Sequence, residues 1–207
     1  ELLAMHGYPS TLPYTPSDYD RFKYPFAGLE DLDTNYSRHF QDMFVLSLLD
    51  GKRNGTFVEL GCGHPELYNN TLERMCHIFS RERTTNVTLG DAANTDYKTL
   101  FKQNCLEQHI DLLRINAETA SIEALNKIPF DKYEFGVIQF QHNAAWWGPE
   151  FREESRKILN KIGYVLFVSD ISTDTSQNYE DWWVHPMHAN KKPEMKSINK
   201  INFAWDY

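Results

Sequence analysis

The sequence predicts an α/β domain with an open, mostly parallel, doubly wound sheet. Two patterns predict it: short β-rich runs alternate with helical stretches of about ten residues, and polar or glycine residues follow directly after the strands. The 207 residues are 41% hydrophobic, which is enough to fill the core of one domain and excludes a disordered chain. Right-handed crossovers are expected to place helices on both faces of the sheet.

Apolar periodicity and turn residues predict each element in order. Ser37 is available to cap a helix over 37–49, which Asp50-Gly51 ends. The run 56–60 is a buried parallel strand that stops at a glycine loop. Further helices are expected over about 66–79, 96–105, 120–127 and 150–161, and further strands over 87–90, 110–115, 135–140 and 164–168.

The two ends of the chain differ in composition from the domain between them. Residues 1–35 are rich in Pro and Tyr. Because proline disfavours helix, we expect an extended arm that packs on its own domain or on a protein partner. The domain spans 36–190, and 191–207 is a basic tail of the kind that usually forms a solvated face.

Charge and cysteine content exclude several classes of function. The net charge of −8 lacks the electrostatic footprint of a nucleic-acid binder, and no apolar run approaches the roughly 20 residues of a membrane span. Three cysteines without a CxxC spacing argue against structural zinc and favour a reducing compartment, the cytoplasm. His185 and His188 with Asp181 are an alternative metal site, but Pro186 breaks the helix that this spacing needs, so no metal is expected.

The ends of the predicted strands carry the residues of a candidate site. In an open α/β sheet, ligands bind at the carboxyl ends of the strands. Glu59 is followed by Gly61-Cys62-Gly63, where glycines let the backbone approach a ligand closely. This is not the GxGxxG motif of dinucleotide binders, because Glu66 stands at the third glycine position.

Several segments together resemble the FkbM-type S-adenosylmethionine-dependent methyltransferases, which have a Rossmann-like fold. The segment 59–63, ELGCG, resembles their first motif, and 110–125, IDLLRINAETASIEAL, resembles their "DLLKIDVEGAE" pattern. The stretches 36–42, 90–92, 163–170 and 180–186 also resemble family members, the last two as closing strands. The resemblance covers about residues 36–187.

This resemblance implies methyl transfer from S-adenosylmethionine to a hydroxyl of a sugar, a glycan or another small metabolite. By motif position, Glu59, Gly61 and Gly63 hold the methionine end of the cofactor. Asp91 and Ala92 contact the adenine. Glu118 and His142 face the acceptor.

Two departures from the family keep a second function open. Asn116 replaces the family's Asp, and Thr119 replaces its Gly. Residues 64–86 have room for one crossover helix but not for the usual second strand; either the strand is lost or the sequence omits a segment. The alternative is therefore a catalytically inactive methyltransferase fold that acts as a structural or assembly subunit. A nicotinamide dehydrogenase has less support, because the third glycine and a ribose-binding acid are absent from their expected places.

Two kinds of candidate side chain allow both a functional and a structural interpretation. His142 is either a general base on the acceptor hydroxyl or a hydrogen-bonded residue at a strand end. The tryptophans either stack on a sugar ring and line a cleft, or serve as core and interface anchors. Four of the five tryptophans form two adjacent pairs, Trp146-Trp147 and Trp182-Trp183.

Overall fold

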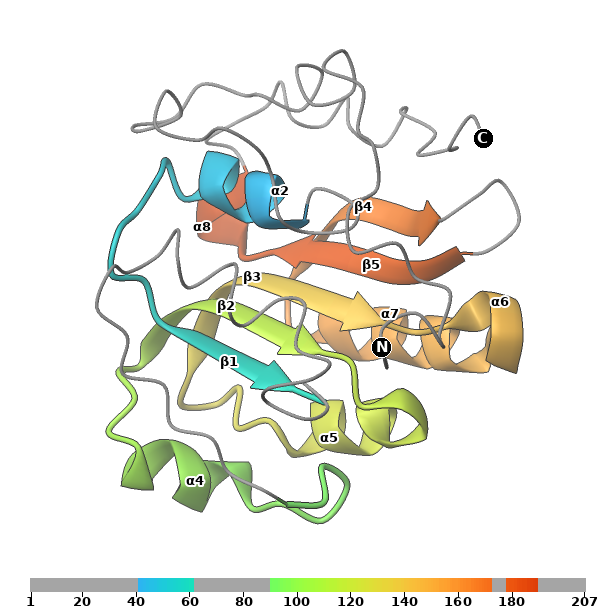
Figure 1. Ribbon diagram of the computed structural model, residues 1–207, viewed down its shortest axis with the longest axis horizontal. Coiled ribbons are helices and arrows are strands. Elements are labelled where there is room, and N and C mark those ends of the chain that lie inside the picture. The colour runs from blue at the N-terminus through green and yellow to red at the C-terminus, as the bar shows by residue number, and fades with distance from the viewer. Residues whose placement is uncertain (1–40, 62–89, 173–177, 190–207) are drawn as a thin grey trace, which may run out of the picture.

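The computed structural model describes residues 41–61, 90–172 and 178–189, in which helices pack on an open five-stranded sheet (Figure 1). The strands are β1 (Phe57–Leu60), β2 (His109–Ile115), β3 (Glu134–Gln141), β4 (Val165–Ser172) and β5 (Asn178–Val184). The helices are α2 (Gln41–Leu48), α4 (Tyr97–Gln103), α5 (Ser121–Lys127), α6 (Ala144–Trp147), α7 (Glu150–Lys161) and α8 (Pro186–Ala189), and η3 (Glu118–Ala120) is a 3-10 turn. The predicted α/β class is confirmed.

The sheet is mixed, whereas a mostly parallel sheet was expected. Its order is β1-β2-β3-β5-β4. β1, β2 and β3 pair in parallel, but β5 lies between β3 and β4 and runs antiparallel to both. The physical reason is the short connection from β4 to β5, residues 173–177. A parallel crossover needs a dozen or more residues, so the chain can only turn back on itself.

The element boundaries follow from local hydrogen bonds. Helix α4 is shorter than the predicted 96–105, because Asp96 caps it by accepting a hydrogen bond from the Thr99 N–H at 3.1 Å. At its other end, the Asn104 amide donates to the Leu100 carbonyl at 2.9 Å. Side chains that bond to terminal backbone groups stop a helix at that turn. Helix α7 keeps its predicted bounds, Glu150–Lys161.

Two separate apolar cores cover the two faces of the sheet. Helix α2 packs on one face with a core that includes Phe44 and Trp182, and we call this the α2 face. Helices α4, α5 and α7 pack on the other face with a core that includes Phe101 and Trp183, and we call this the α7 face. Helices therefore lie on both faces of the sheet, as expected. This three-layer arrangement explains why the inner strands β2, β3 and β5 are buried on both sides.

Several predictions fall outside the described residues. These are the arm 1–35, the tail 191–207, the helix over 66–79, most of the strand over 87–90, the second strand within 64–86, and Gly63. Within 41–61, 90–172 and 178–189, every helix is too short or too polar to cross a lipid bilayer.

Candidate functional site

The carboxyl ends of the parallel strands share an uncommon backbone feature. Left-handed φ angles occur at Gly61 after β1 (82°), Glu118 after β2 (51°), Asn143 after β3 (50°) and Asp170 near the end of β4 (57°). Residues other than glycine adopt this conformation at a cost, and such residues gather at functional sites. Left-handed φ angles also occur in the segments that precede β1 and β2, at Asp50, Asn54 and Cys105, so this feature alone does not distinguish the carboxyl edge.

The loops after β1 and β2 touch at Gly61. A Cβ atom at this position would lie 1.8 Å from the Asn116 carbonyl oxygen and 2.8 Å from the Ala117 Cα. The Asn116 N–H donates to the Leu60 carbonyl at 2.8 Å and holds the two loops together. Glycine is thus required here by a contact between two loops. Gly61 is exposed, so its backbone remains approachable from solvent, and its contact with a cofactor stays a prediction.

Glu59 lies on the α2 face as part of an ion pair. Its Oε1 is 3.4 Å from Nη1 of Arg114, and Nη2 of the same guanidinium is 3.8 Å from Oε2 of Glu180. The side chain of Glu59 is 7% exposed and that of Glu180 is fully buried. Trp182 donates from its indole nitrogen to Glu180 at 2.6 Å. Glu59 therefore reaches the edge of the sheet as one member of a buried charged group.

His142 is completely buried on the α7 face, directly after β3. Its Nδ1 accepts a hydrogen bond from the Ala144 N–H at 3.1 Å, so the proton of the neutral ring is assigned to Nε2. Nε2 lies 3.6 Å from Oδ1 of Asp181. Both ring nitrogens face protein atoms, and this geometry favours the structural interpretation of His142. Its role as a general base stays a prediction.

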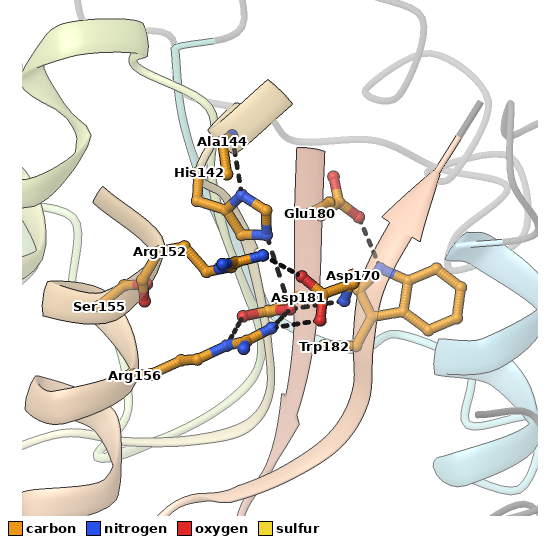
Figure 2. Close-up of polar contacts among 9 residues, drawn as sticks. All are labelled: His142, Ala144, Arg152, Ser155, Arg156, Asp170, Glu180, Asp181 and Trp182. Carbon is orange, nitrogen blue, oxygen red and sulfur yellow. Dashed lines mark hydrogen bonds and ion pairs between the residues drawn. The ribbon is translucent and has the colours of Figure 1, made fainter. Parts of the chain in front are cut away.

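Two arginines and two aspartates form a network behind His142, which Figure 2 shows. Arg156 donates to both carboxylate oxygens of Asp181, at 2.8 and 2.9 Å, and to Asp170 at 2.8 Å. Arg152 donates to the other oxygen of Asp170 at 3.0 Å. The Asp170 N–H donates to Asp181 at 2.8 Å. We call Arg152, Arg156, Asp170 and Asp181 the arginine–aspartate network; its two positive and two negative charges balance.

The network shifts the ionisation of its members. Burial tends to raise the pKa of Asp181, but the donors of His142 and Arg156 outweigh it, so the pKa lies below the ordinary value. The hydrogen bonds to Asp181, and then those to Asp170, hold the pKa of Arg156 above its usual range. Asp181 is thus kept ionised in the fold.

The same side chains have the donor atoms of a metal site but not its electrostatics. Ligand atoms of His142, Asp170 and Asp181 lie within 4.8 Å of one another. However, the Arg156 guanidinium already binds both carboxylates, and a cation in that position repels a metal ion. His185 and His188, both in the described part of the chain, do not join Asp181 in such a group.

The other predicted site residues occupy two different places. Glu118 is exposed in η3, beside the loop that contacts Gly61. Asp91 is exposed and accepts hydrogen bonds from Ala93 and Asn94 in its own turn. The carbonyl of Ala92 accepts a hydrogen bond from the hydroxyl of Tyr97 at 2.8 Å.

This turn is attached to the far end of α5. The ammonium of Lys127, in the last turn of α5, donates to the carbonyl of Ala93, whereas Glu118 precedes the first turn of that helix. The structure therefore brings Glu59, Gly61 and Glu118 to one edge, and it holds Asp91 and Ala92 at the opposite end of α5.

The two tryptophan pairs differ in burial. Trp182 and Trp183 are both 0% exposed and belong to the cores of opposite faces. Trp146 and Trp147, on α6, are 56% and 36% exposed. The core interpretation is confirmed for the first pair, and only the second pair is available to a ligand.

Sequence reasoning missed Arg152 and Arg156. They are four residues apart, so they lie on the same side of α7, and one of them pairs with an aspartate inside a buried aromatic strand. A charged residue in such a strand requires a partner. Asp181 in the run 180–183, EDWW, was the signal that could have pointed to a cation on a neighbouring helix.

No family model matches the chain, and no curated protein or solved structure matches it either.

Proposed function

We propose that this chain binds S-adenosylmethionine at the carboxyl edge of β1 and β2 and transfers its methyl group to a hydroxyl of a sugar or small metabolite. The observation that carries the proposal is the contact of Gly61 with the 116–117 loop. It brings the glycine loop after β1 beside the segment that resembles the family's "IDVEG" stretch. Ligands of open α/β sheets bind at this edge.

The strand order gives further support. The segments 163–170 and 180–186, which resemble closing strands of the family, contribute to the neighbouring strands β4 and β5 at one end of the sheet. The reversed direction of β5 is compatible with that role, because a doubly wound sheet tolerates an antiparallel strand outside its parallel centre. We accordingly propose that the domain has a Rossmann-like methyltransferase fold.

The cofactor would supply an electrophilic methyl group on a sulfonium ion, and the chain would position both reactants. The exposed backbone of Gly61 and the charged group of Glu59 and Arg114 would hold the methionine end. Glu118 is an exposed carboxylate at the same edge, so it is suited to accept the proton of an acceptor hydroxyl. His142 would act by holding the turn before α6 in place.

A second candidate function is a catalytically inactive methyltransferase fold that serves as a structural subunit. One observation favours it: the carbonyl that meets Gly61 belongs to Asn116, which stands where the family has Asp. The carboxylate of the family's motif is therefore missing from the loop that would contact the cofactor, and a structural subunit does not need it.

Calorimetric titration of S-adenosylmethionine and S-adenosylhomocysteine into the full chain tests the two candidates. Micromolar binding that Glu118→Gln leaves intact and Glu59→Gln weakens at least tenfold would support the methyltransferase. Asp131→Asn, an exposed aspartate outside the edge, is the matched control and should change nothing. If circular dichroism shows that the protein is folded and no binding is detected at millimolar ligand, the methyltransferase proposal is wrong and the structural subunit remains.

A further inference from the structure

Helix α6 lies at the carboxyl edge of the sheet (Figure 1). Two of its large aromatic side chains are exposed to solvent. We call Trp146 and Trp147 the tryptophan platform. The other exposed large apolar side chains in the described residues are Ile162, Val165 and Met187. These lie at the end of α7, the start of β4 and in α8, which is the opposite edge. Indoles left in water forgo the free energy of burial, so an exposed adjacent pair calls for a ligand.

Hydrogen bonds hold the backbone of the platform. The N–H groups of Trp146 and Trp147 both donate to the Asn143 carbonyl, at 3.0 and 3.1 Å. Asn143 is itself held by the Tyr179 carbonyl of β5 at 2.9 Å. Left-handed residues, Asn143 and Gly148, close the turn at both ends. A surface that is already ordered loses little entropy when it binds, which favours recognition of a small ligand.

The area of the platform argues against a protein partner. The exposed parts of two indoles amount to on the order of 200 Å². A standard protein interface buries about 800 Å² on each partner. Among the described residues, no further exposed large apolar side chain adjoins the pair. The platform thus has the size of one or two rings.

Polar side chains lie on the neighbouring elements α7 and β4. The ring of Trp147 packs against that of Phe151 at 5.7 Å between centroids. The next residue, Arg152, bonds to Asp170, and these two side chains are 25% and 30% exposed. A pyranose has a face of C–H groups that can stack on an indole and a rim of hydroxyls that a guanidinium and a carboxylate can bind.

We propose that Trp146 and Trp147 bind the methyl acceptor, with a pyranose ring stacked on an indole and its hydroxyls bonded to Arg152 and Asp170. The inference rests on the proposed function, because it assigns the acceptor side of that site. These residues then determine specificity: they select acceptors that carry a ring, and they orient the hydroxyl relative to the edge of β1 and β2.

The indole N–H signals of ¹⁵N-labelled protein provide the test, with S-adenosylhomocysteine present. The probes are the methyl pyranosides of glucose, mannose and galactose, and the control probe is sorbitol, which has the hydroxyls without the ring. We expect at least one pyranoside to shift the signals of Trp146 and Trp147, each assigned by its alanine variant, and sorbitol to shift neither. Trp146→Ala should weaken binding at least tenfold, whereas Met187→Ala, with a 58% exposed side chain, should leave it unchanged.

Two results would overturn the platform. One is the absence of a shift with all three pyranosides at tens of millimolar. The other is a dimer in sedimentation that Trp146→Ala dissociates, which would make the pair an interface between two copies of the chain. Failure of the platform can be distinguished from failure of the proposed function. Pyranoside shifts without cofactor binding would mean that the platform is a sugar-binding surface and that the proposed function is wrong. Cofactor binding without the shifts would support the methyltransferase and reject the platform as its acceptor site.

Discussion

The chain contains two Trp-Trp pairs that occupy opposite environments. Trp182 and Trp183 on β5 are completely buried, whereas Trp146 and Trp147 on α6 are 56% and 36% exposed. In a strand, neighbouring side chains point to opposite faces, so each residue of the first pair enters a different core. α6 is a single turn beyond the end of β3, and among the described residues neither of its tryptophans belongs to either core. Burial of a tryptophan is thus decided by the element that carries it and by what covers that element.

This comparison separates structural from candidate binding residues. Phe44 of α2 packs on Trp182 with 4.6 Å between ring centroids, and Glu180 accepts its indole N–H. Trp182 thus joins the apolar core to the charged group of Glu59 and Arg114. The ring of Trp147 contacts that of Phe151, on the helix that follows. The first pair should therefore control stability, and the second should control ligand binding.

The largest expected effect is on the buried pair. Trp182→Ala should lower the free energy of unfolding by about 3–5 kcal/mol, because it opens a cavity against Phe44 and removes a donor from Glu180. Trp146→Ala should change it by no more than about 0.5 kcal/mol. Urea denaturation followed by circular dichroism measures both. If Trp182→Ala does not fold, Trp182→Phe, which keeps a ring there, should fold with a smaller loss. Equal losses for Trp182→Ala and Trp146→Ala would contradict the comparison.

The sequence was sufficient for most of the fold because periodicity is a local property. Strands β1, β2 and β3 and helix α7 lie within one or two residues of their predicted bounds. The residue pattern of 178–184 did not predict a strand, because the charged pair Glu180-Asp181 interrupts the apolar run. The position of β5 between β3 and β4 depends on pairing with distant strands, and no local pattern encodes that pairing.

The candidate site was less predictable than the fold. The edge itself could be located, since Gly61 and the 116–118 segment follow parallel strands. The orientation of side chains at that edge could not. Whether His142 faces a ligand or Asp181 depends on where α7 places Arg156, which is a tertiary contact. The same applies to Asp91, whose position depends on the packing of its turn against α5.

The next expected effect concerns the arginine–aspartate network. Asp181→Asn should cost about 3 kcal/mol at pH 7, because Arg156 loses a buried charged partner. The pKa of Asp181 is lowered in the fold, so its contribution is present above the ordinary carboxyl pKa of 3.8 and is lost as pH falls through the lower folded value. Unfolding measured at several pH values should show the cost shrinking below about pH 4.

Asp131→Asn is the control for this series, because Asp131 is exposed in a loop. Its effect should stay within about 0.5 kcal/mol at every pH. A cost for Asp181→Asn that does not depend on pH would mean that the carboxylate acts through shape and not through charge.

The smallest expected effect links the buried and exposed regions through His142. Its Nδ1 accepts the Ala144 N–H, so His142→Leu should cost about 1 kcal/mol and speed hydrogen exchange at the Ala144 amide. His142→Asn places an amide oxygen near the position of Nδ1 and should restore protection of that amide. Hydrogen exchange by NMR measures the protection of the Ala144 amide in the two variants. A methyl-transfer assay measures their activity. If His142→Asn restores amide protection but abolishes methyl transfer to a pyranoside, the histidine acts as a base. If both are restored, it acts by holding α6 and the tryptophan platform in place.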